Sequence, residues 1–388
     1  MDTVTPDALA GEISEKLARL QKLLREKQCA GICLTLAANF AWITGGLADN
    51  QIAHSNEVGS ATLVILADGR KFVVAAHSEV PRLMDQALGQ LGYEPIETKW
   101  YGPAPDLFRR LNLSGPLASD IPQKDGVVVD LTLCRRPLTA TEVQKYRLAG
   151  LRCVEAVAEV TRQVRPGMTE REIETMSAHA LMQRGLRPTV LLIGSDERIY
   201  RYRHCLPSDK PVGKYAMVNV CARRWGLVVS ATRFVHFGPL EKELRERLRA
   251  AAIVNANYFA ALRPRARAAD ILERAKKWYA DQGFPGEWEF HHQGGGTGYR
   301  EREYVIHSGS EEVVLDHEAF AFNPTVQGAK VEDTVVVVGD GVENLTTLAD
   351  WPAIHVVLNG RSYSCPDILI HGAAQTSWPD PVVPGYAG

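Results

Sequence analysis

Residues 289–299, which read EFHHQGGGTGY, contain the side chains of this 388-residue chain that look most able to do chemistry. His291 and His292 are adjacent, and imidazoles bind metal ions or transfer protons near neutral pH. Residues 294–296 are all glycine and offer no side chain to a ligand or a substrate. The stretch therefore predicts either a metal site or an acid–base centre, and it raises the question of why such a centre adjoins three glycines.

Other catalytic templates are missing from the sequence. The GGGTG run lacks the strand–helix context of a phosphate-binding loop, and no GxGxxG, GK[ST] or GxSxG motif occurs. The seven cysteines are scattered and never form CxxC. We therefore expect a reducing compartment, with Cys29 and Cys33 as buried core thiols.

Charge and hydropathy exclude several classes of partner. The formal net charge of −2 and the pI near 6.6 give no overall attraction to nucleic acid or to an anionic membrane. The N-terminal segment predicts an amphipathic helix without the apolar core of a signal peptide, and no run approaches the ~18–20 apolar residues of a membrane span. We expect a cytoplasmic protein that acts on a small molecule and has no nucleic-acid or membrane partner.

The length favours two domains, a small α/β domain of residues 1–136 and a larger α+β domain of residues 137–388. In the first, a leucine stripe predicts an opening helix, AGICLTL predicts a buried strand, and ATLVILADGRKFVVAA predicts a hairpin that turns at its Asp-Gly pair. A helix over 79–91 and a buried strand over 126–134 complete this domain.

The second domain is expected to begin with two capped helices. Thr139 and Glu142 form a capping-box pattern, and so do Thr169 and Glu172. Strands follow, then a helical run over 240–282, and strands again from that point on. RPGMTEREIE and LRPRARAADIL occupy equivalent places in the two halves of this domain, which indicates an internal duplication.

This second domain resembles the pita-bread fold of the M24 peptidase family, which includes creatinase, aminopeptidase P, prolidase and methionine aminopeptidase. The landmarks occur in the family's order: RPGMTE between two helices, MVNVCARRWGLVVSATRFV, HHQGGGTGY, FNPTV and KVEDTVVV. The resemblance covers about 139–350, and residues 10–135 look like the smaller N-terminal domain of creatinase and aminopeptidase P. It implies a creatinase-type α/β domain followed by an α+β pita-bread domain.

In the family's metalloenzymes, two aspartates, one histidine and two glutamates bind two divalent cations. Matched position by position, the aspartate positions here hold Asn219 and Ser230, the histidine position holds Gly295, and the first glutamate position holds Asn323. Only the last carboxylate remains, as Glu332 in KVED. One carboxylate with two amides and a hydroxyl offers little charge to a hard divalent ion, so we expect no metal and no other cofactor.

Two further expectations follow from these replacements. The bare Gly295 should leave space where a metal-bound imidazole would stand in the family's metalloenzymes. A rebuilt mononuclear site that uses His291, His292 and Glu332 is the alternative to a centre without metal.

Creatinase has this fold and hydrolyses a C–N bond without metal, so the loss of ligands is compatible with catalysis. The resemblance implies that His204, in YRHCLPSD, is the general base and later the acid. His291 would polarise the scissile carbonyl or protonate the leaving nitrogen, and Glu332 would orient a histidine or pair with a cationic substrate group. The substrate-binding candidates are His292, Arg302, Arg233, Asn219, Asn323, Tyr299, Phe40 and Trp42.

Some of these candidates carry a more specific expectation. Arg233 and Arg302 would anchor a substrate carboxylate through bidentate pairing. Phe40 and Trp42 would line the site of the second subunit in a creatinase-type homodimer, or else pack as ordinary strand core.

We therefore expect a metal-independent hydrolase of an amide or amidine C–N bond in a small polar metabolite. A lyase or a C–C bond-cleaving enzyme on the same scaffold is the first alternative, because it needs the same base and charge stabiliser. A pseudopeptidase that only binds is the second, although a decayed site need not keep His204, His291 and Glu332. A metal-dependent Xaa-Pro peptidase is the least favoured, since it would require the lost ligands.

Overall fold

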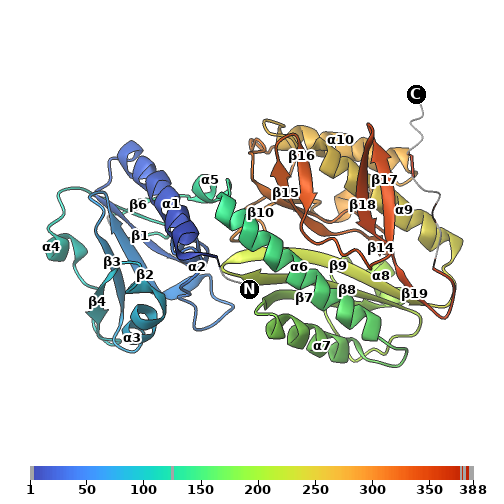
Figure 1. The fold of residues 1–388 in the computed structure, drawn as a ribbon, viewed down its shortest axis with the longest axis horizontal. Helices are drawn as coiled ribbons and strands as arrows, with labels where there is room; N and C mark the ends of the chain where they lie inside the picture. The colour runs from blue at the N-terminus through green and yellow to red at the C-terminus, as the bar shows by residue number, and fades with distance from the viewer. Residues whose placement is uncertain (1–3, 124–125, 376–377, 379–381, 384–388) are drawn as a thin grey trace. The chain divides into compact units, whose positions relative to one another are not determined.

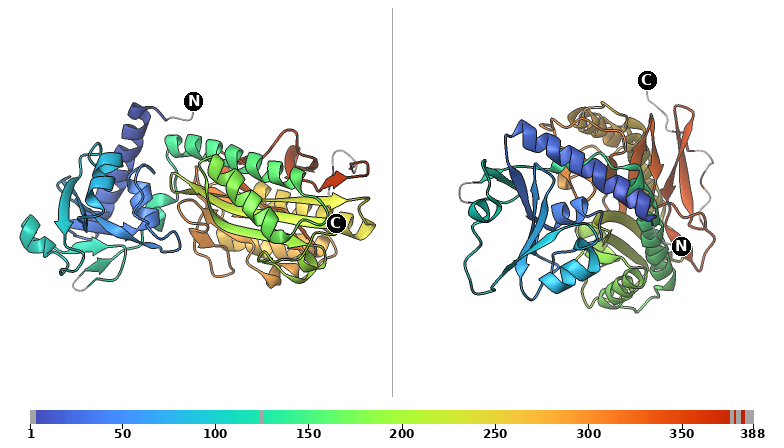
Figure 2. Two further views of the ribbon diagram at one scale, coloured as in Figure 1. Left: turned by 90° about the horizontal axis from the view of Figure 1, so that it is seen from below. Right: turned by 60° about the vertical axis from the view of Figure 1, so that its left-hand side comes forward.

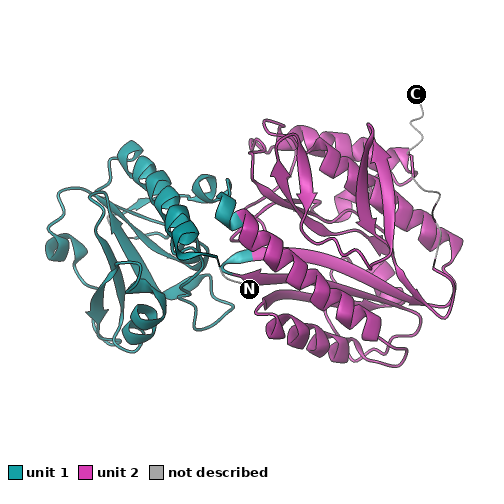
Figure 3. Ribbon diagram, in the orientation of Figure 1, with its two compact units in different colours: residues 1–142, 225–227 teal, residues 143–224, 228–388 magenta. Residues whose placement is uncertain are grey.

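The computed structural model describes residues 4–123, 126–375, 378 and 382–383, and the chain forms two compact units (Figures 1 and 3). Unit 1 consists of Met1–Glu142 and Trp225–Leu227, and unit 2 consists of Val143–Arg224 and Val228–Gly388. The predicted boundary after residue 136 lies shortly before the first passage of the chain from unit 1 to unit 2.

Unit 1 is built on a six-stranded sheet with the strand order β4-β3-β2-β1-β5-β6 (Figure 1). The strands are β1 (Gly31–Leu36), β2 (Val58–Leu66), β3 (Lys71–Ala76), β4 (Glu94–Thr98), β5 (Leu117–Ser119) and β6 (Val127–Val128). The helices are α1 (Pro6–Glu26), α2 (Ala37–Ile43), α3 (Val80–Leu83), which leads into a π-helical turn (Met84–Leu88), α4 (Leu107–Leu111) and α5 (Thr132–Arg135). The predicted hairpin is confirmed as β2 and β3, and Cys33 of β1 is buried in the core of the unit.

Two predictions for unit 1 are wrong. Residues 126–134 do not form one buried strand, because Asp130 accepts hydrogen bonds from the backbone N–H (2.9 Å) and the hydroxyl (2.7 Å) of Thr132. This local turn ends the extended backbone and leads into α5. Phe40 and Trp42 were expected either to line a site or to pack as strand core. They lie in helix α2, so the strand is wrong.

The first half of unit 2 pairs two long helices and a short one with a four-stranded sheet of order β19-β9-β8-β7. The long helices are the green ones in Figure 2. Its elements are α6 (Ala140–Gln163), α7 (Glu170–Gln183), β7 (Arg187–Ser195), α8 (Glu197–Arg201), β8 (Tyr215–Arg224), β9 (Leu227–Phe237) and, from the end of the chain, β19 (Leu369–His371). Helix α7 packs on β7 and β8. Both predicted capping boxes are confirmed; in the first, the Glu142 carboxylate accepts from Thr139 N at 2.7 Å, and the Thr139 hydroxyl accepts from Glu142 N at 3.2 Å.

The second half of unit 2 has a five-stranded sheet of order β11-β10-β12-β15-β16. Its elements are α9 (Lys242–Ala261), α10 (Ala268–Asp281), a 3-10 turn η2 (Glu287–Phe290), β10 (Gly294–Thr297), β11 (Tyr304–Val305), β12 (Ala319–Phe322), β13 (Thr325–Val326), β14 (Ala329–Lys330), β15 (Asp333–Val338), β16 (Gly341–Asn344), β17 (Ala353–Leu358) and β18 (Arg361–Pro366). The predicted helical run over 240–282 is thus two helices, because Pro264 cannot continue α9. The strand expected directly after α10 is replaced by η2.

The two halves repeat one hydrogen-bonding pattern at the start of their second helices. Before α7, Gly167 N donates to Val212 O at 2.8 Å, and before α10, Arg265 N donates to Val314 O at 2.9 Å. In return, Val212 N donates to Met168 O at 2.8 Å, and Val314 N donates to Ala266 O at 2.9 Å. These contacts involve the RPGMTEREIE and LRPRARAADIL segments, so they support the predicted internal duplication.

All seven cysteines are free thiols, and Cys29 and Cys33 are buried as predicted. Within the described part of the chain, the helices are too short or too polar to cross a membrane.

Candidate functional site

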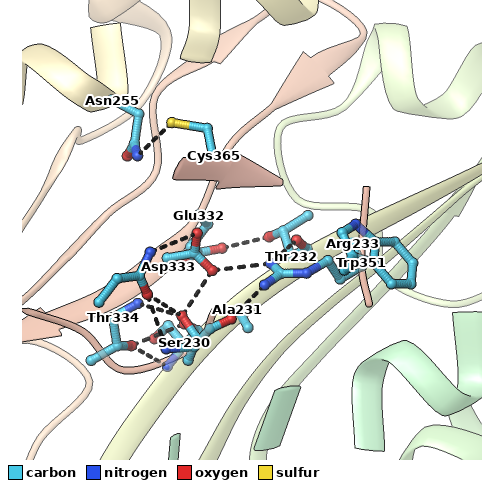
Figure 4. A network of polar contacts seen from close by, with 12 residues as sticks. Ser230, Ala231, Thr232, Arg233, Asn255, Glu332, Asp333, Thr334, Trp351 and Cys365 are labelled. Atoms are coloured by element: carbon cyan, nitrogen blue, oxygen red, sulfur yellow. Dashed lines mark hydrogen bonds and ion pairs between the residues drawn. The ribbon is translucent and has the colours of Figure 1, made fainter. Parts of the chain in front are cut away.

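Two neighbouring residue pairs in unit 2 connect β9 to the start of β15 (Figure 4). Thr232 on β9 donates its hydroxyl hydrogen bond to Oε2 of Glu332, just before β15, at 2.7 Å. The next residues on the two segments, Arg233 and Asp333, form their own ion pair at 3.0 Å. Because successive side chains of an extended chain point to opposite faces, one pair belongs to the site and the other to the core.

Arg233 has a different role from the one predicted. Its guanidinium donates to Asp333, to the backbone carbonyl of Thr232 at 2.7 Å and to that of Thr346 at 2.6 Å, and the residue is only 2% exposed. It therefore joins strands in the core and is not placed to anchor a substrate carboxylate.

Glu332 is surrounded by donors and cations. Its Oε2 accepts from Asn219 Nδ2 at 2.5 Å and from the Thr232 hydroxyl, and it lies 2.8 Å from Lys330 Nζ, while Arg302 Nη2 is 3.7 Å from Oε1. Burial by itself would raise the pKa of this carboxyl. The positive charges of Lys330 and Arg302 and the hydrogen bonds outweigh burial, so the pKa is below its usual value and Glu332 is ionised at neutral pH.

His291 is held by the protein at one ring nitrogen, Nε2. The Thr325 hydroxyl donates to the Asn323 carbonyl oxygen at 3.0 Å, so it accepts from His291 Nε2–H, which is 3.2 Å away. The side-chain amide of Gln293 lies 3.4 Å from His291 Nδ1, but its two N–H groups donate to the backbone carbonyls of Trp288 at 3.1 Å and His291 at 3.0 Å. The contact with Thr325 selects the neutral Nε2–H tautomer. In this arrangement Nε2–H is used by Thr325 and Nδ1 carries no proton, so neither nitrogen can donate to a substrate carbonyl, the role predicted for His291.

Burial, and next to it the charge of Lys330, lower the pKa of His291 to about 3. The pKa of an unfolded histidine is near ~6.5, so between these values the unfolded chain binds more protons than the folded protein, and stability falls as the pH falls. When the pH is lowered from 7.5 to 5, the free energy of unfolding of the wild type should fall by about 1–2 kcal/mol more than that of His291→Gln. Urea unfolding at the two pH values measures this difference. The exposed His179→Gln serves as control, and an unchanged pH dependence in His291→Gln would contradict the assignment.

His204, His291 and His292 form a cluster of imidazoles. The ring centroids of His204 and His291 are 6.4 Å apart, and those of His291 and His292 are 6.0 Å apart. The protein around the His204 ring and the charge of Lys330 lower its pKa, although the residue is exposed by surface area, and Glu332 acts in the opposite direction. His292 is exposed by surface area, yet the protein around its ring and the charge of Arg302 lower its pKa to about 4. All three side chains are therefore neutral at pH 7.

The loop that carries His204 is tied to helix α7 through the residues that follow it. The Ser208 backbone N–H and hydroxyl donate to Oε2 of the buried Glu170 at 3.0 Å and 2.6 Å, and Asp209 pairs with Arg171 at 2.9 Å. The His204 ring is exposed and has no hydrogen bond to another described residue. A fixed backbone with an unengaged imidazole is the arrangement that a proton-transfer residue requires.

Two buried polar atoms of the site have no hydrogen-bond partner in the described part of the chain. They are Nε of Arg302, a donor, and Oδ1 of Asn323, an acceptor. Asn323 is 4% exposed, so its unpaired oxygen is costly unless another group satisfies it. Both residues were predicted to bind substrate, and a substrate that offers an acceptor and a donor would satisfy these atoms.

The positions that hold metal in the family do not offer a suitable donor set here. A Cβ added at Gly295 would lie 2.2 Å from the carbonyl oxygen of Tyr304 on β11, so the expected space for an imidazole does not exist. The Ser230 hydroxyl lies 3.2 Å from the Cys221 thiol, whose pKa burial raises to about 11. Among the described residues, no group of three or more His, Cys, Asp or Glu could hold a metal ion.

Three remaining candidates are buried. Tyr299 is 3% exposed, and its backbone N–H donates to Glu303 at 3.0 Å. Phe40 and Trp42 are each 0% exposed. Their side chains have no accessible surface in this chain with which to line a site, so the predicted role of Phe40 and Trp42 gains no support.

Sequence reasoning missed the residues that hold His291. Thr325 lies two residues after Asn323 in FNPTV, and Gln293 lies two residues after His291, so alternation along an extended chain was the available signal. Tyr279 of α10 completes this group, since its hydroxyl donates to Gln293 Oε1 at 2.7 Å and accepts from Thr325 N at 3.1 Å. No local pattern identifies Tyr279, because its contacts depend on how α10 packs.

The repeated helix–strand halves of unit 2, with polar residues of both meeting at Glu332, define a pita-bread protein. A family model described as Metallopeptidase family M24 matches residues 144–339, and the chain belongs to this family. It is similar to the dipeptidase PepE from Mycobacterium ulcerans (20% identity, TM-score 0.73, 93% of this chain and 98% of that one). It is also similar to an Xaa-Pro dipeptidase from Bacillus anthracis (17% identity, TM-score 0.72, 92% of this chain and 100% of that one).

Among curated proteins, an uncharacterized peptidase from Staphylococcus aureus strain MW2 is 25% identical over 232 residues. This match covers 56% of the present chain and 65% of the relative, so the chain spans less than two thirds of that protein.

Proposed function

We propose that this protein is a metal-independent hydrolase that cleaves a C–N bond, of amide or amidine type, in a small polar metabolite. The observation that carries the proposal is the set of neutral imidazoles beside an ionised Glu332 whose Oε2 already accepts from three protein donors. Such a set supplies proton transfer and leaves little of the carboxylate for a metal ion. The unpaired Arg302 and Asn323 atoms suit a substrate group that both accepts and donates hydrogen bonds, as an amide does.

In the proposed reaction, neutral His204 removes a proton from water as the water oxygen attacks the carbon of the C–N bond. The charge that develops on the attacked group is stabilised by Arg302, and the imidazolium of His204 then protonates the leaving nitrogen. Glu332 holds Lys330, Asn219 and Thr232 in place and favours the protonated state of His204. His291 is a positioning residue in this scheme, because its only N–H is directed at Thr325.

Two further expectations belong to this proposal. The substrate is a small molecule, and the protein works in the cytoplasm as a homodimer.

His204→Ala tests the proposed base. We expect kcat/KM on the substrate, found by screening amides, amidines and Xaa-Pro dipeptides, to fall about 100-fold or more. Because the pKa of His204 is lowered, the wild-type enzyme should keep its activity below pH 6.5, where an ordinary histidine becomes protonated. His179→Ala, at an exposed position on α7, is the matched control.

Three outcomes would contradict the proposal. Unchanged turnover in His204→Ala would exclude it as the base. Loss of activity on treatment with a chelator, restored by added metal, would indicate a metal-dependent peptidase. Failure to incorporate ¹⁸O from labelled water into the product would indicate a lyase or another non-hydrolytic reaction.

A further inference from the structure

The ammonium of Lys330 lies between two oxygens that come from different parts of unit 2. Its Nζ is 2.8 Å from Glu332 Oε2 and 3.3 Å from Asn219 Oδ1, and the residue is 7% exposed. Asn219 is on β8, while Lys330 ends the short strand β14. By the family resemblance, Asn219 and Glu332 are two of the positions that bind metal. A positive charge therefore already contacts one oxygen at each of these two positions.

The other hydrogen bonds keep these oxygens directed at Lys330. Asn219 Nδ2 donates to Thr232 Oγ1 at 2.8 Å and to Glu332 Oε2 at 2.5 Å, which orients its Oδ1 toward the ammonium. Glu332 Oε2 accepts from Asn219, Thr232 and Lys330 together. A metal ion bound to Oε2 would have to displace one of these donors, and it would also lie close to a buried ammonium of like charge.

We propose that Lys330 is the resident cation of this site and that its ammonium excludes divalent metal ions even when a lost carboxylate is restored. The ammonium balances the buried Glu332 as a metal ion would, with no requirement for coordination geometry. A carboxylate introduced at position 219 while Lys330 is kept would therefore strengthen the contact with Lys330 and would not create a metal site.

The test compares Mn²⁺ binding to Asn219→Asp with binding to the double variants Asn219→Asp/Lys330→Ala and Asn219→Asp/Lys330→Arg. We expect Asn219→Asp and the arginine double variant, which both keep a cation, to bind Mn²⁺ no better than the wild type. The alanine double variant should bind one Mn²⁺ at least about tenfold more tightly, by titration calorimetry and by loss of the free Mn²⁺ EPR signal. Adding Glu332→Gln to it should remove the gain and locate the ion.

Folding of each variant is checked by circular dichroism and thermal melting. If the alanine double variant does not fold, Asn219→Asp/Lys330→Gln keeps a side chain of similar length without the charge and takes its place. Equal Mn²⁺ affinity in Asn219→Asp and in the folded uncharged double variant, whether tight or absent, would overturn the proposal. Stoichiometric metal in the purified wild-type protein would also overturn it. Neither result depends on the identity of the substrate.

Discussion

Gly295→Ala should destabilise unit 2 by about 3 kcal/mol, although it adds a single methyl group. The new Cβ would lie 2.2 Å from the Tyr304 carbonyl oxygen and 3.1 Å from Val305 Cα. Both atoms belong to the backbone of β11, which pairs with β10 through Gly295 and Val305, so they cannot yield as a flexible side chain would. Gly295→His, which restores the family's metal-binding residue type, should cost at least as much.

Urea unfolding followed by tryptophan fluorescence measures this effect, with the transition of each unit fitted separately. Gly11→Ala is the matched control, because Gly11 is an exposed residue within α1 and an added Cβ would have no neighbour within 4 Å. That substitution should stabilise unit 1 by up to about 1 kcal/mol, since alanine favours the helix. If the free energy of unfolding of Gly295→Ala were within about 0.5 kcal/mol of the wild-type value, β11 would be able to move away from the new methyl group.

Glu332→Ala should cost about 3–5 kcal/mol, because it leaves the buried ammonium of Lys330 without its carboxylate. The amide of Asn219 and the hydroxyl of Thr232 would lose an acceptor at the same time. Glu332→Gln keeps the shape and should show how much of the loss is due to charge. The free energy of unfolding from denaturant titration is the measurement.

The control for this charge effect is an exposed ion pair of the same kind. Glu343 is paired with Arg147 at 2.7 Å, and both side chains are exposed at 38% and 48%. Glu343→Ala should therefore cost no more than about 1 kcal/mol. Similar losses at Glu332 and Glu343 would mean that the carboxylate of Glu332 adds little to stability, which would contradict its central place in the site.

Local patterns predicted much of the fold. The hairpin of β2 and β3 and the capping boxes at Thr139 and Thr169 depend on residues a few positions apart, and all three are present. The strand predicted over 126–134 is wrong for an equally local reason. The hydrogen bonds from Thr132 to Asp130 form a turn that interrupts the apolar run.

The site was harder to predict, because it depends on which face each side chain takes and on strand register. Thr232 and Arg233 are neighbours, yet one contacts Glu332 and the other contacts Asp333. The lack of space at Gly295 comes from the pairing of β10 with β11, which the sequence of either strand does not reveal. The family resemblance located Glu332 and the lost ligands, but it gave no information about the partners of His291.

The tip of the β8–β9 hairpin limits which segments of the chain can be deleted or exchanged. Trp225–Leu227 belongs to unit 1, whereas most of β8 and β9 belongs to unit 2. Gly46 approaches the tip so closely that an added Cβ would be 2.3 Å from the Trp225 carbonyl oxygen. Deleting residues 1–142 would therefore strip the tip of its packing partners on the same strands that carry Asn219 and Thr232. A chimera that exchanges the N-terminal segment with that of a relative must exchange residues 225–227 as well, and we expect the two segments to covary.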